Sequence, residues 1–289
     1  MSTSSGHSQS ATAAIRGYAR HSLAAAAAEI RKAGGGQGVH GARRGVKRLR
    51  SLLRLVAPAI GKTAVKTADQ HLKAAAGLLA GARRGEALLL AASRLHTGEL
   101  TQQCLASAIA EHSLAYLDKT AQTTAAKLTL EHIAKVRRKI NGWHLPDDGA
   151  DFYLTGLKRS YGKARKGLAR ALDNGDPKAL HDARKHVIHC LHHIELLQEL
   201  WPEIEAARLQ RFNGLREALG DFNDLAELRG IVLPGIFPGA ACQARIVSAM
   251  SEREAALLKK ARKISKRIFA RKPGAFARRI GAMWEKAIG

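Results

Sequence analysis

Aromatic residues, cysteines and long apolar runs are all scarce in this chain of 289 residues. Phe, Trp and Tyr make up 4% of the residues, too few to supply many of the platforms on which bases of single-stranded nucleic acid stack. The three cysteines lie far apart with no metal-ligand spacing, which excludes a disulfide framework and indicates core thiols in a reducing compartment. No run of about 18 apolar residues occurs, so no membrane-spanning segment is predicted.

Acidic residues are also scarce relative to basic ones. The 24 Asp and Glu face 48 Lys and Arg, a formal net charge of +24. Such an excess predicts a polyanionic partner, namely nucleic acid, an anionic membrane or another polyanion. The 46% apolar content predicts a folded core instead of a basic tail. Residues 1–10 are expected to be a disordered lead, and no targeting signal is predicted, so a cytoplasmic location is expected.

The chain is predicted to be all-α. It is rich in Ala, Leu, Lys and Arg and shows no sustained alternation of apolar and polar residues. Breaks are predicted at residues 34–38, 97–98, 142–149, 174–177 and 234–238. Asp176 and Pro177 suit the cap and first position of a helix. The 142–149 loop is expected to separate a first helical bundle, residues 11–141, from a second, residues 151–289.

The two halves resemble each other. A shift of 141 residues places Val39, Ala42, Val46, Leu49, Leu53 and Val56 on Leu180, Ala183, Val187, Cys190, Ile194 and Leu197. Steps of three and four residues make this set one apolar helix face in both copies. The pattern predicts an internal duplication of a helical unit of roughly 140 residues.

Basic residues recur at helical spacing. Arg43, Lys47, Arg50 and Arg54 form one stripe with Arg44 and Arg48 beside it, and Arg159, Lys163, Lys166 and Arg170 repeat the spacing. Like charges on one face repel, whereas a phosphate polymer would neutralise them, and Arg binds phosphate oxygens in pairs. The stripes therefore favour phosphate binding over the alternative of ordinary solvated helix faces.

Histidines begin the motif helices and form a cluster. His40 and His181 occupy matching positions, where a histidine can cap a helix, bind a carboxylate or contact phosphate. The cluster comprises His181, His186, His189, His192 and His193. A protonatable phosphate-facing surface is favoured over a metal site, because no Cys or carboxylate completes a zinc pattern. In that case binding should strengthen as the pH falls through about 6.5.

Catalytic chemistry has little support in the sequence. Asp221, Asn223 and Asp224 are expected to orient Arg or Lys or to cap a helix. No carboxylate cluster for magnesium, no Gly-Lys-Ser/Thr phosphate loop and no nucleophile elbow is found. No catalytic residue, metal or cofactor is therefore predicted. The basic segment 252–286 has an apolar side expected to close the second bundle and cations expected to extend the polyanion surface, with a membrane-surface helix as the alternative.

The order His-x-x-Arg-x-x-x-Lys-Arg-x-Arg, repeated and followed by Leu-Gly-Asp-x-Asn-Asp at residues 219–224, resembles the CHAD domain (conserved histidine α-helical domain). The resemblance runs from about residue 11 to at least residue 229, and the first copy matches fully, at His40, Arg43, Lys47, Arg48 and Arg50. It implies two four-helix bundles related by a pseudo-two-fold axis, with basic residues around a central pore or furrow that binds inorganic polyphosphate. It also implies association with polyphosphate granules and no catalysis.

The second copy departs from the family pattern at Ile188, His189 and Leu191, and in the first half Arg84 replaces the usual Asp. The second half should therefore contribute less fixed charge. The predicted polyphosphate-binding set is His40, Arg43, Arg44, Lys47, Arg48, Arg50, Arg54, Arg159, Lys163, Lys166, Arg170, His181, Arg184, Lys185 and His189. Two alternatives remain open: a nucleic-acid-binding protein using the same basic faces, and a phosphohydrolase or phosphotransferase with a phosphorylated histidine.

Overall fold

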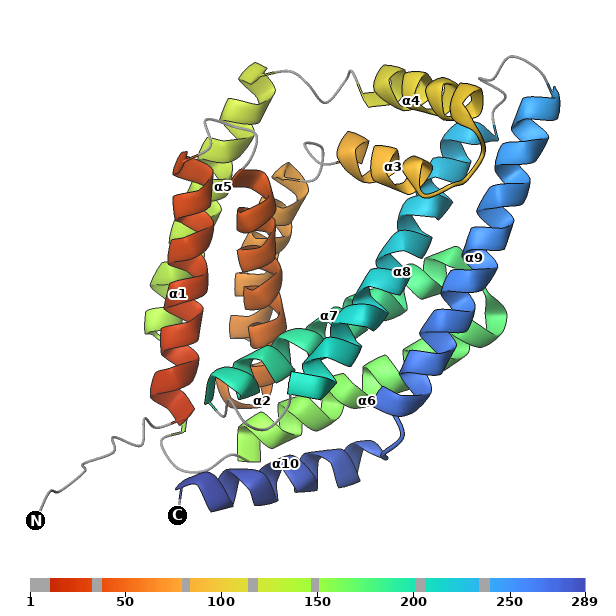
Figure 1. Cartoon of the computed structure of the whole chain (residues 1–289). Coiled ribbons are helices and arrows are strands. Elements are labelled where there is room, and N and C mark those ends of the chain that lie inside the picture. Colours follow the sequence, from red (N-terminus) through yellow and green to blue (C-terminus); the bar gives the residue numbers. More distant parts are fainter. Residues whose placement is uncertain are drawn as a thin grey trace, which may run out of the picture.

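The predicted all-α class is confirmed. A computed structural model describes residues 11–32, 38–79, 84–113, 119–146, 151–200, 206–233 and 240–288, and this part of the chain contains ten helices and no strand (Figure 1). In chain order they are α1 (Ala11–Lys32), α2 (Gly38–Leu78), α3 (Arg84–Ser93), α4 (Glu99–Ser113), α5 (Lys119–Asn141), α6 (Asp151–Asn174), α7 (Pro177–Leu200), α8 (Ala206–Val232), α9 (Ala240–Ile268) and α10 (Pro273–Ile288).

The predicted start of α7 is confirmed in detail. The carboxylate of Asp176 accepts hydrogen bonds from the backbone amides of Ala179, at 2.9 Å, and Lys178, at 3.3 Å. Pro177 takes the first helical position, where its missing N–H costs nothing. The cap therefore fixes where the second basic motif begins.

Helix α2 bends sharply at Gly61, a break that the sequence reading did not predict. Gly61 has φ of 80°, a left-handed conformation that glycine adopts without strain, and Pro58 lies one turn before it. In a straight helix, Arg50 and Asp69 would lie about 28 Å apart. Their side chains instead form a hydrogen bond of 2.8 Å, so the second arm of α2 folds back beside the first.

The two sequence halves on either side of the 142–149 loop pack against each other. The first arm of α2 packs on α1, its second arm contacts α5 through His71 and His132, and α2 also packs against α6 and α7 of the second half. The hairpin of α3 and α4 packs on α8, away from α1 and α5 (Figure 1). The hydrophobic core runs continuously through both halves. The two sequence halves are therefore joined along α2 and along α8.

Several contacts relate positions 141 residues apart. Ser51 contacts His192, and Thr101 contacts Cys242, so two pairs of matching positions touch each other. Gln102 donates to the carbonyl oxygen of Ala92, while its counterpart Gln243 donates to that of Val232, in each case at the end of the preceding helix. Such pairs are expected where a pseudo-two-fold axis passes, so the fold is compatible with the predicted duplication.

Helices α2 and α6 approach closely at Gly156, which gives a stability prediction. A Cβ atom at this buried position would collide with the carbonyl oxygen of Leu55, a backbone atom that cannot move without displacing α2. The substitution Gly156→Ala is therefore expected to lower the free energy of unfolding by about 1–3 kcal/mol, as overpacking does. Urea denaturation followed by circular dichroism would measure the change.

Gly17 supplies the matched control, because it is exposed on α1 and a Cβ atom there would meet nothing within 4 Å. Gly17→Ala is expected to leave stability unchanged or to raise it by up to about 1 kcal/mol through helix propensity. Equal effects of the two substitutions would show that α2 and α6 do not approach as closely as described.

Candidate functional site

A cavity of about 950 Å³ lies between α2, α7 and α8, with α3 at one edge. Its lining consists of Arg43, Lys47, Arg50, Arg54, Gly77, Ala87, His181, Asp182, Arg184, Lys185, His186, Ile188, His189, Asn223, Asp224 and Glu227. A second cavity of about 470 Å³ adjoins it and shares Arg43, Lys47 and Arg184. We call the two cavities together the furrow.

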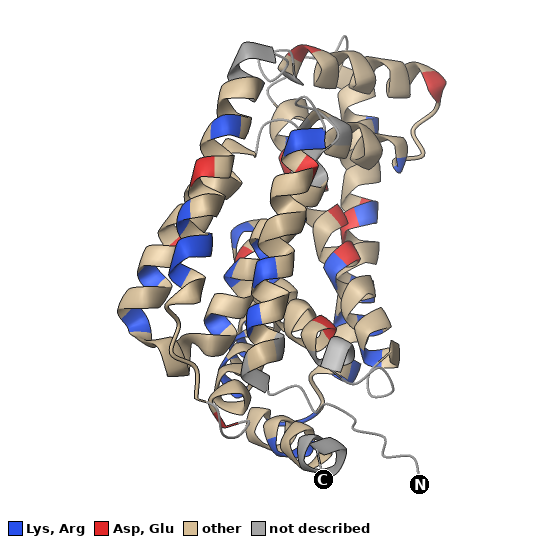
Figure 2. Cartoon of the chain, turned by 90° about the vertical axis from the view of Figure 1, so that its left-hand side faces the viewer, with Lys and Arg blue, Asp and Glu red and all other residues tan. Residues whose placement is uncertain are grey.

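The furrow is positively charged. Six Arg and Lys line the larger cavity against three Asp and Glu. The smaller one adds Arg44, Arg48, Arg94 and Arg216, together with Glu195, Glu217 and Asp221. Burial raises the pKa of Asp224, and the Arg184 charge opposes the shift. Figure 2 views the chain from the side of α1 and α5 and shows Lys and Arg along these helices as well, so basic residues are not confined to the furrow.

The first motif supplies most of the fixed charge, as its sequence predicts. Arg43, Lys47, Arg50 and Arg54 all lie on the first arm of α2 and line the larger cavity. Arg43 donates to the carbonyl oxygen of Leu79, which follows the second arm. From α7 the structure brings in Arg184 and Lys185, with Ile188 on the wall where a cation occurs in the family pattern.

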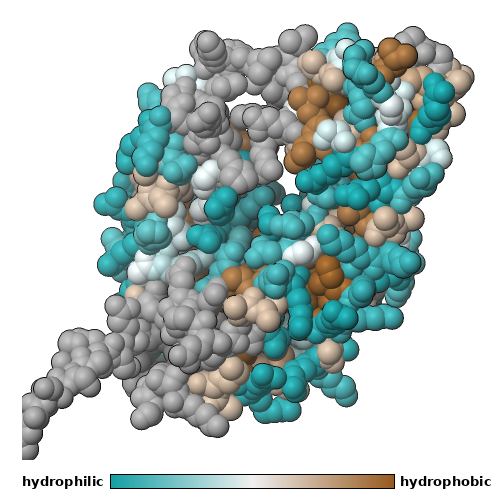
Figure 3. Space-filling model, in the orientation of Figure 1, coloured by the Kyte–Doolittle hydropathy of each residue, from teal (hydrophilic) through white to brown (hydrophobic). Residues whose placement is uncertain are grey.

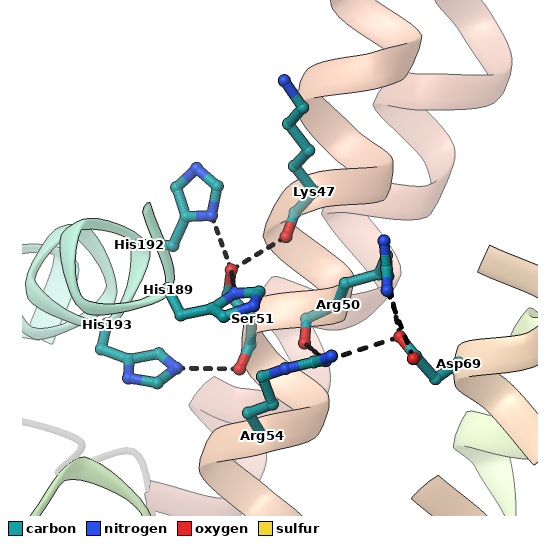
Figure 4. A network of polar contacts seen from close by, with 8 residues as sticks. All are labelled: Lys47, Arg50, Ser51, Arg54, Asp69, His189, His192 and His193. Carbon is teal, nitrogen blue, oxygen red and sulfur yellow. Dashed lines mark hydrogen bonds and ion pairs between the residues drawn. The ribbon is translucent and has the colours of Figure 1, made fainter. Parts of the chain in front are cut away.

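Asp69 holds two of these arginines in place (Figure 4). Its carboxylate accepts hydrogen bonds from Arg50, at 2.8 and 3.3 Å, and from Arg54, at 3.5 Å. Burial alone would raise the pKa of Asp69, but the hydrogen bonds and charges of the two arginines outweigh it and lower the pKa below 3.8. A permanently charged carboxylate orients the guanidinium groups and cancels part of their charge. The sequence does not predict Asp69 as a site residue, because only the bend of α2 at Gly61 brings its carboxylate to Arg50.

Ser51 is the centre of a histidine network between the two halves (Figure 4). Its hydroxyl donates to the carbonyl oxygen of Lys47 and contacts Nδ1 of both His189 and His192 at 2.8 Å. His193 Nε2 donates to the carbonyl oxygen of Ser51 at 2.8 Å. A hydroxyl that gives its one proton to Lys47 can accept from both imidazoles, which places a proton on Nδ1 of each.

The expectation of a protonatable histidine surface needs correction for these residues. Burial lowers the pKa of His192 to about 3 and that of His193 to about 4, and it lowers the pKa of His189 further still. His186 is also lowered, first by burial and then by the charge of Lys163. These imidazoles are neutral near neutral pH and serve as hydrogen-bonding groups. They cannot strengthen anion binding by gaining charge near pH 6.5.

The structure describes the side chain of one of the two motif histidines, His181. His181 is exposed at the cavity, and its Nδ1 contacts the amide oxygen of Asn223. The side chain of His40 lies outside the described residues, as does that of Arg84. Asp182, beside His181, forms an exposed ion pair of 2.8 Å with Lys185.

The basic stripe on α6 is not part of the furrow lining. Arg159, Lys163, Lys166 and Arg170 are all exposed and appear in the wall of neither cavity. Lys163 lies at the edge of the furrow, because its charge acts on His186, and Gly167 on the same helix lies near the His186 ring. The stripe therefore flanks the furrow on the outside.

Asp221 orients basic residues from two neighbouring segments, as expected from the sequence. It forms ion pairs with Arg94, in the turn after α3, and, at 3.6 Å, with Arg253 of α9. Arg48 is likewise paired with Glu195 of α7 at 3.2 Å. These pairs fix the smaller cavity. Arg94 and Glu195 could not be predicted as site residues, because each is distant in the chain from the residue with which it pairs.

The described residues contain neither a cluster of potential metal ligands nor a helix suited to crossing a membrane. Within them, no three or more His, Cys, Asp or Glu side chains gather as potential metal ligands. Among the helices so described, none has both the length and the apolar character needed to cross a membrane.

Comparison with known proteins places the chain in a family. The model of the CHAD domain matches residues 11–233, which include α1 to α8. The structure of the CHAD domain from the plant Ricinus communis is 18% identical, with a TM-score of 0.59, and the match covers 89% of this chain and 91% of that chain. PptA from Streptomyces chartreusis is 14% identical, with a TM-score of 0.62, covering 91% and 100%. None of the curated proteins compared matches the sequence. The two structures share the fold, and the family match over most of its length shows that this chain belongs to the CHAD domain family.

Proposed function

We propose that this protein binds inorganic polyphosphate in the furrow without altering it chemically, and that this binding attaches it to polyphosphate granules. The observation that carries the proposal is the convergence of Arg43 and Lys47 from the first motif and Arg184 from the second on both cavities. Guanidinium groups form paired, charge-assisted hydrogen bonds with phosphate oxygens. A linear polymer with a negative charge at every repeat can contact all three at once.

The furrow also contains neutral polar groups. With its Nδ1 proton directed at Ser51, His189 is held in a fixed orientation at the cavity wall. His181 and Asn223 add polar groups at the exposed end. A site in which ten Arg and Lys outnumber six Asp and Glu over the two cavities suits a ligand that is anionic along its whole length.

Nucleic acid is the second candidate, because its backbone is also a phosphate polymer. The described lining of the two cavities contains no Phe, Tyr or Trp on which a base could stack. Binding of duplexes through phosphates alone would still be possible at low salt. The lining therefore favours polyphosphate, which has no bases to accommodate.

Isothermal titration of the protein with long-chain polyphosphate, pyrophosphate, duplex DNA and single-stranded RNA at two salt concentrations tests the proposal. Polyphosphate is expected to bind tightly at both concentrations, whereas nucleic acids are expected to lose at least about tenfold more affinity at the higher one. Counterion release supplies nearly all of the non-specific affinity for nucleic acids, whereas paired hydrogen bonds to the furrow arginines add to the affinity for polyphosphate. Released orthophosphate should stay at the background level during the titration. Equal binding of every polymer would make the furrow a general cationic surface, and release of orthophosphate would make the protein an enzyme.

A further inference from the structure

A second basic surface lies outside the furrow, on α6, α9 and α10. Residues 155–172 contain six Lys and Arg and residues 255–284 contain ten, and neither segment contains Asp or Glu. The second segment lies beyond residues 11–233, so the family match does not account for it. Figure 3 shows mostly hydrophilic residues on the right-hand side, where α9 runs, with some hydrophobic residues between them.

The cations of α9 project into solvent. Lys259, Lys263, Lys266 and Arg267 are exposed on the side of the helix opposite to the buried Leu257, Ala261 and Ile268. Within the described part of the chain, none of the four forms an ion pair. Arg262, on the flank of α9 nearest to α6, is paired with Asp173 and the backbone of Leu172. Packing therefore explains Arg262 but not the outer four, whose mutual repulsion destabilises the helix.

Helix α6 connects this surface to the furrow. On one flank, a Cβ atom at Gly167 would lie 4.0 Å from the ring of His186, which lines the furrow, and Lys163 lies one turn before Gly167. On the other flank, Arg165 donates to the carbonyl oxygen of Phe269 at the end of α9. Lys166 and Arg170 are exposed on the same helix. Positive charge thus continues from the furrow, over α6, to α9.

Helix α10 is unsuited to insertion into a lipid surface. Its apolar residues Phe276 and Ile280 are buried, and the ring of Phe276 stacks on Tyr161 of α6. Among the described side chains of α10, the exposed cations are Arg278 and Arg279. An interfacial helix instead needs a free apolar face. Among the described side chains, the surface therefore offers charge without apolar anchors, which suits a soluble phosphate polymer.

From this continuity we infer that the surface formed by Lys163, Lys166, Arg170, Lys259, Lys263 and Lys266, here called the outer surface, is a second binding site for inorganic polyphosphate. The inference rests on the proposed function of the furrow. A chain longer than the furrow contacts the outer surface with its protruding part. Linking two sites on one polymer raises the overall affinity without a new contact in the furrow, because the second binding event is intramolecular.

The outer surface differs chemically from the furrow. It is rich in exposed lysines, which act as mobile point charges, whereas the furrow uses arginines fixed by Asp69 and by the Leu79 carbonyl. Binding at the outer surface therefore depends on counterion release and is sensitive to salt. The outer surface therefore raises the affinity for long chains, whereas a short chain is bound by the furrow alone.

The test compares tripolyphosphate with long-chain polyphosphate on a variant carrying Lys259→Glu, Lys263→Glu and Lys266→Glu. The affinity for tripolyphosphate is expected to stay at the wild-type value, because the furrow is intact. The affinity for long-chain polyphosphate is expected to fall at least about tenfold, with a smaller dependence of log Kd on log salt. An unchanged affinity for the long chain would overturn the inference.

The matched control carries Lys127→Glu, Arg137→Glu and Arg138→Glu on α5, which has the same change of net charge on a helix that packs on α1 and α2. An equal loss in this control would show a general effect of charge and overturn the inference. The inference would also be overturned if the α9 variant lost the binding of duplex DNA but kept the binding of long-chain polyphosphate. If the Glu variant loses helical content, the corresponding Lys→Gln variant gives the same comparison. A wild-type protein that binds neither phosphate polymer would refute the furrow proposal itself.

Discussion

Replacing Arg43, Lys47 and Arg184 together with glutamine is expected to weaken the binding of long-chain polyphosphate at least about a hundredfold. These three cations line both cavities of the furrow, so a bound chain cannot avoid them. Each charge-assisted hydrogen bond lost costs about 1.5–3 kcal/mol. The slope of log Kd against log salt should also fall by about two to three, since three fewer counterions are displaced.

Glutamine is chosen because it keeps a donor for the Leu79 carbonyl that Arg43 now satisfies. Titration calorimetry measures the binding, and circular dichroism verifies that helical content is retained. Lys127, Arg137 and Arg138 on α5, replaced with glutamine, give a control with the same loss of charge outside the furrow. Wild-type affinity in the furrow variant would exclude this furrow as the polyphosphate site.

The sequence predicts those features of the site that depend on one helix. The spacing of Arg43, Lys47, Arg50 and Arg54 places them on a single face, and all four line the larger cavity. The start of α7 follows from Asp176 and Pro177 for the same reason, because capping involves neighbouring residues. Local periodicity and local hydrogen bonding are readable without knowledge of the packing.

Features that depend on how the helices pack could not be predicted from the sequence. Asp69 reaches Arg50 only because α2 folds back at Gly61, and an isolated glycine within a helical pattern does not reveal such a bend. The α6 stripe has the same spacing as the α2 stripe, yet Lys166 and Arg170 lie outside the furrow. Spacing shows which residues share a face, but not what the face meets.

The histidines of α7 give a second example, because their burial could not be predicted from the apolar stripe of that helix. An apolar stripe predicts burial of one face, through positions such as Val187 and Cys190. Helix α7, however, packs against α2, α6 and α8, so residues outside the stripe are buried as well. His192 and His193 are enclosed in this way and form the junction with Ser51 instead of an anion-binding surface.

This buried junction is expected to make stability depend strongly on pH. In the unfolded chain the histidines take up protons near pH 6.5. In the folded chain burial lowers the pKa of His192 to about 3 and of His193 to about 4. Between those values the unfolded state binds more protons, so the free energy of unfolding falls as the pH falls. From about pH 7 to about pH 5 the loss is about 2 kcal/mol for each of these histidines.

Urea denaturation across this pH range measures the effect, and a variant carrying His192→Asn and His193→Gln isolates it. An Asn amide nitrogen can replace Nδ1 of His192 as donor to the Ser51 hydroxyl, and a Gln amide nitrogen can replace Nε2 of His193 as donor to the Ser51 carbonyl. Neither amide titrates, so the double variant should lose about 4 kcal/mol less than wild type over the same interval. His21→Gln, at an exposed position on α1, should keep the wild-type slope. A double variant with the wild-type pH dependence would mean that His192 and His193 are not neutral and buried against Ser51, and that the two halves meet there in some other way.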